Sequence, residues 1–241
     1  MIIKVENLEY TYPDGTQALK GIDLDIFRGE SVGLIGPNGA GKSTLLLHLN
    51  GILKGRQGWV EILGMKVEEK NLIKIRRKVA IVFQQPDDQL FMPTVFDDVA
   101  FGPINAGYPQ EKVREKVRKA LKEVDMEDCE KRCSHHLSFG EKKRISLATV
   151  LSMQPEILIL DEPASNLDPR ARRHLIKLLK NLNLTKIVAG HDLELILDIC
   201  QRVVLLDEGK IVANGRASKV LKNKSLMESH GLEVPLSLNH R

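Results

Sequence analysis

The stretch "GPNGAGKST" at residues 36–44 decides the fold of this chain. It fits the pattern G-x-x-x-x-G-K-[ST] through Gly36, Gly41, Lys42 and Ser43. The apolar run "SVGLIG" precedes it and the helix-like run "LLLHLN" follows it. In this strand–loop–helix context, backbone N–H groups can surround phosphate oxygens, and the helix start adds about half a positive charge. The stretch therefore predicts a phosphate-binding loop, and a glycine-rich turn without a ligand is the alternative.

Short apolar runs alternate with helical patterns along most of the chain. The runs at 31–36, 78–83, 156–160, 185–190 and 202–206 are predicted as strands of a sheet covered on both faces. Helical spacing relates Val113, Val117, Leu121 and Val124, and again Leu175, Leu178, Leu179 and Leu182. This alternation predicts an α/β fold with a mostly parallel sheet. Together with the phosphate-binding loop, it resembles a P-loop NTPase (RecA-like) core.

The flanking segments indicate how the chain is organised. Residues 2–28 alternate like an N-terminal antiparallel β subdomain, and "DEGK" at 207–210 has the form of a hairpin turn. The segment 87–150 is richer in helix patterns and charge, which favours an inserted α-helical subdomain. We therefore expect one domain over 1–215 and a helical C-terminal extension over 216–241. We predict this extension as one amphipathic helix with a frayed end after Pro235.

Composition excludes several classes of function. The 241 residues carry a formal net charge of +4, with 36 basic and 32 acidic residues, which is too mild to indicate nucleic-acid binding. No apolar run reaches the roughly 18 residues of a membrane span, and the N-terminus has no signal-peptide pattern. Three cysteines suggest a reducing compartment rather than a disulfide framework. The cluster Cys129, Cys133, His135 and His136 fits no common zinc pattern.

The run "ILILDEP" at 157–163 is an apolar strand that ends in two carboxylates. The carboxyl ends of strands are where open α/β sheets bind ligands, so this pair is expected beside the phosphate-binding loop. There Asp161 and Ser43 would hold Mg²⁺, Lys42 would reach the β- and γ-phosphates, and Glu162 would polarise or position an attacking water. A helix-capping Asp-Glu pair in a loop is the alternative.

A second anion site is indicated by "LSFGEKKR" at 137–144. Ser138 precedes a basic, helix-like run, and a helix start with free N–H groups attracts anions. With this stretch the chain resembles the ATP-binding subunit of ABC transporters over nearly its whole length. "LSFGE" resembles the signature motif LSGGQ and "SNLD" at 165–168 the D-loop with Asp168. His191 resembles the switch histidine, Gln84 the Q-loop glutamine and Tyr12 the aromatic residue that stacks on adenine.

The resemblance implies an ATP hydrolase whose cofactors are ATP and Mg²⁺. Two subunits, either identical or related, would pack head to tail around two ATP molecules, with one chain's signature helix facing the other's P-loop. Its implied nucleotide-binding residues are Tyr12, Gly36, Pro37, Asn38, Gly39, Ala40, Gly41, Lys42, Ser43 and Thr44. The implied catalytic residues are Glu162, His191, Gln84 and Lys42. The implied Mg²⁺ ligands are Ser43, Gln84 and Asp161. The implied signature residues, which act on the partner's nucleotide, are Ser138, Phe139, Gly140 and Glu141.

Each of these assignments has a plainer alternative. His191 could be an ordinary strand-end histidine, Tyr12 could simply cover the sheet, and Gln85 rather than Gln84 could be the Q-loop residue. The sequence also departs from the family's pattern. Phe139 replaces a glycine and must point away from the nucleotide, and Glu141 replaces a glutamine and cannot donate a hydrogen bond when ionised.

Within the family, "FQQPDDQLF" at 83–91 resembles the energy-coupling factor and cobalt/nickel (CbiO-like) group. This implies uptake of cobalt or nickel through integral membrane subunits, with the chain peripheral at the cytoplasmic face of the membrane. Asp87, Asp88 and Phe91 are the expected contacts to those subunits, although a capped helix start also explains the aspartates. Vitamin uptake through an energy-coupling factor complex, a soluble ABC ATPase and a nucleotide-binding regulator are the alternatives. The C-terminal extension is expected either to support the dimer or simply to pack.

Overall fold

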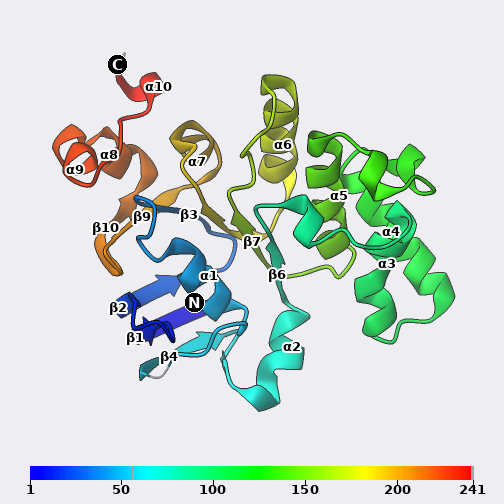
Figure 1. Ribbon diagram of the computed structural model, residues 1–241, viewed down its shortest axis with the longest axis horizontal. Helices are drawn as coiled ribbons and strands as arrows, with labels where there is room; N and C mark the ends of the chain where they lie inside the picture. Colours follow the sequence, from blue (N-terminus) through cyan, green and yellow to red (C-terminus); the bar gives the residue numbers. More distant parts are fainter. Residues whose placement is uncertain (56, 240–241) are drawn as a thin grey trace.

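The computed structural model describes residues 1–55 and 57–239 (Figure 1). One of its two sheets is antiparallel, with strand order β2-β1-β4-β5. These strands span β1 Ile3–Thr11, β2 Gln17–Ile26, β4 Gln57–Ile62 and β5 Met65–Lys66. The predicted N-terminal antiparallel subdomain is confirmed, and β4 and β5 extend it beyond the predicted residue 28.

The other sheet has the order β10-β9-β3-β8-β7-β6. Its strands are β3 Ser31–Ile35, β6 Val79–Val82, β7 Ile157–Asp161, β8 Thr185–Ala189, β9 Arg202–Asp207 and β10 Lys210–Arg216. β9 and β10 pair antiparallel, whereas β9–β3, β3–β8, β8–β7 and β7–β6 pair parallel. The predicted strands are thus present, and Glu208 and Gly209, both at positive φ, form the predicted hairpin turn.

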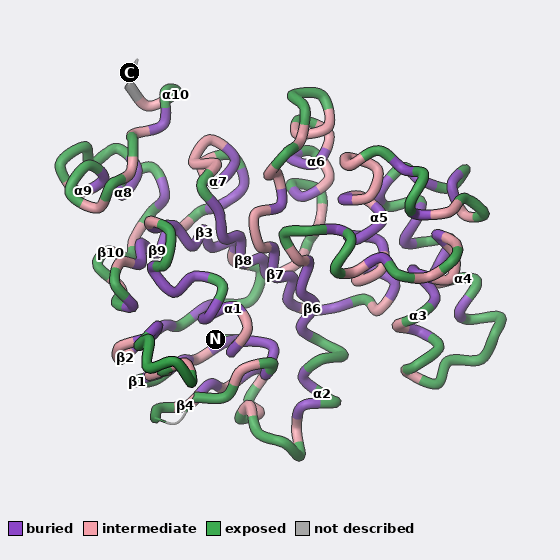
Figure 2. Tube along the Cα trace, in the orientation of Figure 1, coloured by how far each residue is buried: buried purple, intermediate pink, exposed green. Residues whose placement is uncertain are grey.

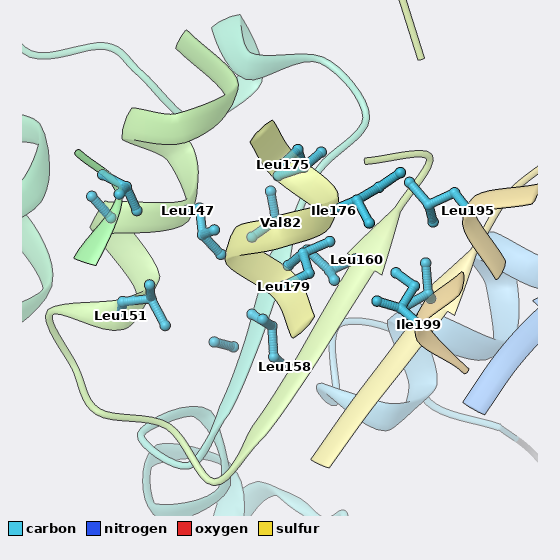
Figure 3. Close-up of a cluster of buried hydrophobic side chains, with 14 of the residues drawn as sticks. Val82, Leu147, Leu151, Leu158, Leu160, Leu175, Ile176, Leu179, Leu195 and Ile199 are labelled. Carbon is cyan, nitrogen blue, oxygen red and sulfur yellow. The ribbon is translucent and has the colours of Figure 1, made fainter. Parts of the chain in front are cut away.

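Strand β7 illustrates why the central strands of this sheet are mostly apolar. Ile157 and Ile159 belong to a core shared with the antiparallel sheet and α1 (Lys42–Leu49). Leu158 and Leu160 point to the opposite face, where α5 (Phe139–Leu151), α6 (Pro169–Asn181) and α7 (Leu193–Ile199) cover the sheet (Figure 3). Side chains alternate between the two faces along a strand, and here both faces are covered. Both sets of side chains are therefore buried, as the purple strands of Figure 2 show.

The helices of segment 87–150 form a layer beside the parallel sheet (Figure 1). α3 (Val95–Asn105), α4 (Gln110–Glu123) and α5 pack against one another. Short 3₁₀ turns lie at Pro86–Asp88, Glu127–Cys129 and Ser134–His136. The buried Asp98 carboxylate joins these pieces, because it accepts hydrogen bonds from the N–H groups of Phe91 and Met92 and from the Ser134 hydroxyl. A further 3₁₀ turn (Glu69–Asn71) and α2 (Leu72–Arg76) precede β6.

The C-terminal extension differs from the single helix that the sequence predicted. It contains α8 (Ala217–Lys222), α9 (Lys224–Ser229) and α10 (Leu236–Asn239). The first two are separate because Asn223 leaves the helical conformation and its side chain caps α9 by accepting from Leu226 N–H. The frayed end predicted after Pro235 is wrong for residues 236–239, because Ser237 bonds the Glu194 carboxylate through its N–H and hydroxyl. Residues 240–241 of the expected extension lie outside the described residues.

A search of residues 1–55 and 57–239 for a membrane-spanning helix finds none with the required length and hydropathy.

Candidate active site

The phosphate-binding loop lies between β3 and α1, and two of its glycines are required by close contacts. Gly36 has φ of 146°, and a Cβ added there would lie 2.0 Å from the Leu206 carbonyl oxygen. Gly41 has φ of 100° and begins α1, and its added Cβ would lie 2.5 Å from the Ala18 carbonyl oxygen. Only glycine accepts both the backbone conformation and the close approach. The loop is thereby fixed against β9 and β2.

Lys42, the loop lysine, is 8% exposed. Its ammonium donates to the carbonyls of Gly36 at 2.7 Å and Pro37 at 3.0 Å. Burial lowers the pKa of Lys42, while the charges of Glu162 and Asp161 act in the opposite direction. The loop therefore holds a cation whose bonds to neutral carbonyls can be exchanged for stronger bonds to an anion.

A cavity of about 490 Å³ opens over the loop. It is lined by Tyr12, Thr16, Ala18, Asn38, Gly39, Ala40, Gly41, Lys42, Ser43, Thr44, Gln84, Asp161, Glu162 and His191. Gly36 and Pro37, which were expected to bind nucleotide, do not line it and instead hold Lys42. Thr16 and Ala18 were missed by the sequence analysis. Thr16 lies just before β2 and Ala18 lies within it, and no local sequence pattern marks either of them as a cavity residue.

The two carboxylates lie at the carboxyl end of β7 as expected: Asp161 is its last residue, and Glu162, the next residue, has a strained backbone. Its φ is 46°, a left-handed conformation that costs about 1–3 kcal/mol for a residue other than glycine. Its N–H donates to the Ala189 carbonyl at 2.9 Å. Its carboxylate accepts from the His191 N–H at 3.3 Å and lies 3.2 Å from His191 Nε2. Parallel neighbours β7 and β8 thus bring Glu162 and His191 together at their carboxyl ends.

Tyr12 and Gln84 both reach this cavity from other elements. The Tyr12 hydroxyl lies 3.0 Å from the Thr44 hydroxyl, and its ring meets Tyr10 edge to face at 4.9 Å between centroids. Gln84 lines the cavity and Gln85 is absent from the lining. The contact with Thr44 places Tyr12 at the side of α1, where an aromatic face can accept a stacked base.

The signature residues Ser138, Phe139, Gly140 and Glu141 do not line the cavity, and neither does Asp168. Ser138 caps α5 in a capping box: its hydroxyl accepts the Glu141 N–H, while the Glu141 carboxylate accepts the Ser138 N–H at 2.8 Å. The exposed Asp168 caps α6, bonding the N–H groups of Arg170 and Ala171. Gly140 faces α6, since a Cβ added to it would lie 3.0 Å from Ala171 Cβ.

Phe139 turns its ring toward Lys143 of the same helix. The Lys143 ammonium lies 5.7 Å from the ring centroid, within the range of a cation–π contact. Burial lowers the pKa of Lys143 to about 8, while the charges of Glu162 and Asp161 oppose that shift. The ring packs along its own helix, in the direction of a neighbouring cation.

The donor set around Lys42 suits Mg²⁺. The Ser43 hydroxyl, the Gln84 amide and the Asp161 carboxylate line one cavity, and Mg²⁺ prefers such oxygen ligands together with phosphates. Among the described residues, no group of three or more histidine, cysteine or acidic side chains is arranged to hold a metal by itself. These side chains therefore fit a Mg²⁺ ion that is bound by a few protein oxygens together with the oxygens of a phosphate ligand.

Comparison with known proteins agrees with this geometry. The family model described as "ABC transporter" matches residues 19–165. An energy-coupling factor transporter ATP-binding protein, EcfA of Methanothermobacter thermautotrophicus, is 48% identical over 239 residues, which cover 97% of this chain and 77% of the relative.

Solved structures agree as well. CbiO1 of Clostridium perfringens, described as part of the ABC transporter complex CbiONQ, superposes with a TM-score of 0.85 at 40% identity. That match covers 99% of this chain and 98% of CbiO1. The ATP-binding cassette MJ0796, solved as a dimer in a post-hydrolysis state with ADP and phosphate, superposes with a TM-score of 0.80 at 30% identity. That match covers 90% of this chain and 99% of MJ0796.

The P-loop fold and the cavity that contains Lys42 and Glu162 indicate the same family as these relatives. The chain belongs to the ABC transporter family as an ATP-binding, ATP-hydrolysing subunit of the energy-coupling factor and CbiO-like group.

Proposed function

We propose that this ATPase acts as a head-to-tail dimer, with an identical or a related chain, that encloses two ATP molecules. The observation that carries the proposal is the exposed Ser138 at the start of α5, outside the cavity that holds the P-loop. The start of α1 and the start of α5 can then meet at one phosphate only if a second chain supplies one of them. The dimeric state of the similar cassette MJ0796 supports this arrangement.

Within one site, the residues divide the work by position. Backbone N–H groups of the loop and Lys42 hold the phosphates, and Tyr12 stacks on adenine. Ser43, Gln84 and Asp161 would hold Mg²⁺, which when bound would neutralise charge at the phosphates. Glu162 orients the attacking water and takes its proton, and His191 fixes the Glu162 carboxylate. The partner's Ser138 and the partner's Gly140 complete the site around the terminal phosphate.

Contact with membrane subunits is assigned to the surface around segment 83–91. A groove of about 320 Å³ lies there between the parallel sheet and the helical layer, and its lining includes Asp88 and Phe91. Phe91 is 59% exposed, and its ring meets that of the 45% exposed Phe101 at 5.1 Å. Asp87 pairs instead with Lys142 at 2.7 Å. An apolar rim of this kind suits a helix from an integral membrane partner, which would place the chain peripherally at the cytoplasmic face.

The cargo that this reading favours is cobalt or nickel. It rests on the resemblance of segment 83–91 to the cobalt/nickel group, and the similarity to CbiO1, described as part of the complex CbiONQ, is compatible with it. Vitamin uptake is the second candidate; the relative named EcfA supports an energy-coupling factor complex and its name states no cargo. The two candidates share every step at the ATP site and differ in the membrane subunit that binds the cargo.

Mass spectrometry of the proteins that copurify with this chain from gently solubilised native membranes tests the proposal. We expect a polytopic scaffold subunit together with a small membrane subunit, whose bound metal or vitamin identifies the cargo. Recovery of soluble partners alone, with the chain missing from the membrane fraction, would contradict the transporter assignment.

A further inference from the structure

Lys143 is a buried cation between the signature helix and the ATP site. It lies in the second turn of α5 and is 3% exposed. Its ammonium donates to the Gln84 carbonyl at 2.7 Å and to the Glu162 carbonyl at 3.1 Å. One side chain therefore joins three segments that are far apart in the sequence: the helix that Ser138 begins, the Q-loop segment, and the end of β7.

The Q-loop segment is tied to α5 at further points. The Gln89 amide donates to the Ser146 carbonyl at 2.8 Å and to the Thr149 hydroxyl at 2.7 Å, while its oxygen accepts from the Phe83 N–H at 3.3 Å. Segment 83–89 is thereby attached to the face of α5. A displacement of α5 must move this segment with it, and Lys143 extends the connection to Glu162.

The buried charge of Lys143 indicates a role beyond filling space. Burying an ammonium is costly unless its donors are satisfied, and here two donors meet neutral carbonyls while the Phe139 ring lies over the cation. An apolar side chain of similar length would fill the same space without this cost. A lysine instead fixes the positions of two specific carbonyl groups, one of them on the strained residue Glu162.

We propose that Lys143 is a positioning residue for ATP hydrolysis, which couples the position of the signature helix to the placement of Glu162. The proposal rests on the role proposed above for Glu162. When the start of α5 engages the nucleotide held by the partner chain, its movement is transmitted through the Lys143 ammonium to the backbone of Glu162. The Glu162 carboxylate then reaches the position from which it can orient the attacking water.

The test compares Lys143→Met, which keeps the length and loses the donors, with Lys143→Gln, which keeps an N–H donor. Steady-state ATPase activity is measured on the full chain as a function of MgATP. We expect Lys143→Met to lower kcat about 10- to 100-fold, the effect of losing charge-assisted bonds, with KM changed less than about twofold. Lys143→Gln should recover part of kcat.

Lys186→Met is the matched control. Lys186 is also buried, at 6% exposure, and its ammonium donates to the carbonyls of Leu179 at 3.1 Å and Leu182 at 2.7 Å, away from the cavity. Both Met variants should lose thermal stability, whereas kcat per folded molecule should fall only for Lys143→Met. Equal kcat changes in the two variants would overturn the proposal, since Lys143 would then be a structural lysine only.

A double-mutant cycle with Glu162→Gln separates this inference from the proposed function. If Lys143 acts through Glu162, Lys143→Met should change the residual single-turnover rate of the Glu162→Gln chain less than about twofold. A full additional loss in that background would overturn the inference. If the Glu162→Gln chain hydrolyses ATP at the wild-type rate, both the base assignment and the inference are overturned. If Glu162→Gln is slow but Lys143→Met keeps the wild-type rate, the inference alone is overturned.

Discussion

The starts of α1 and α5 are two helix N-termini built in different ways. α1 begins at Gly41, in a left-handed conformation and without a side-chain cap. α5 begins at Ser138, whose hydroxyl and N–H are both engaged by Glu141. The first N-terminus is open and lies in a cavity with Lys42; the second is already capped and lies outside that cavity.

The difference teaches which helix start is complete within one chain. The open start of α1 leaves N–H groups for a ligand that provides negative charge, because helix N-termini carry partial positive charge. The start of α5 is stabilised by its own carboxylate and needs no ligand to form. We infer that the start of α1 binds phosphate within one chain, and that the start of α5 is preformed and contacts the nucleotide only in a dimer.

The largest effect that we expect is on the chemistry at the α1 side. Glu162→Gln keeps the side-chain shape and removes the base, so kcat should fall about 10²- to 10⁴-fold. Because ATP would then persist, the variant should form an ATP-dependent dimer that size-exclusion chromatography with light scattering can detect. Turnover near the wild-type rate would refute the base assignment.

Gly41→Ala breaks the open helix start. The new Cβ combines φ of 100° with a position 2.5 Å from the Ala18 carbonyl oxygen, so the unfolding free energy should fall by at least about 1–3 kcal/mol. Gly15→Ala is the matched control, because Gly15 has φ of 89° and nothing within 4 Å of its added Cβ. Urea unfolding of both variants separates the cost of the contact with Ala18 from the cost of the positive φ. Equal losses of unfolding free energy would argue that the close approach to Ala18 is unimportant.

Ser138→Ala probes the capped start. Loss of the cap should lower the unfolding free energy by about 0.5–2 kcal/mol and also weaken ATP-dependent dimerisation. Thr94→Ala serves as the control, since Thr94 caps α3 by accepting the Asp97 N–H. Both variants should lose similar stability in urea, but only Ser138→Ala should need more ATP to dimerise. Identical dimerisation curves would remove α5 from the interface.

The smallest expected effect concerns pH. Hydrogen bonds from the N–H and hydroxyl of Ser138 lower the pKa of Glu141, with smaller help from the Arg132 and Arg144 charges. A lowered folded-state pKa stabilises the fold above the ordinary glutamate pKa, and this stabilisation is lost as pH falls through the lowered value. Thermal unfolding between pH 7 and about pH 3 should therefore show a steeper acid loss for the wild type than for Glu141→Gln. Parallel curves would show that the carboxylate does not support α5.

The sequence was sufficient for the parts of the fold that depend on short-range patterns. Continuous apolar runs identified the parallel strands, and the glycine spacing of residues 36–44 located the phosphate loop, because both follow from local conformation. The tail was mispredicted for a local reason as well. Asn223 separates the apolar pair Val220 and Leu221 from the apolar pair Leu226 and Met227, and a side-chain cap between such pairs has a weak sequence signature.

The site was predictable residue by residue only where a motif names the residue. Thr16 and Ala18 enter the cavity through the position of β2, which no local pattern specifies. Lys143 was passed over within a basic run, although it shares a helix face with Leu147 and Leu151, both buried. Because residues four apart lie on one face of a helix, this spacing places Lys143 on the buried face of α5, but its carbonyl partners depend on tertiary packing.

The most direct test of a site divided between two chains is complementation. Lys42→Ala and Ser138→Arg each damage both sites of a homodimer, whereas a mixed dimer regains one site with Lys42 from one chain and Ser138 from the other. Mixing the two inactive proteins should therefore restore ATPase activity, up to about a quarter of wild type for random pairing in a two-fold symmetric dimer. No gain at any mixing ratio, with mixed dimers demonstrated by differential tags, would contradict the divided site.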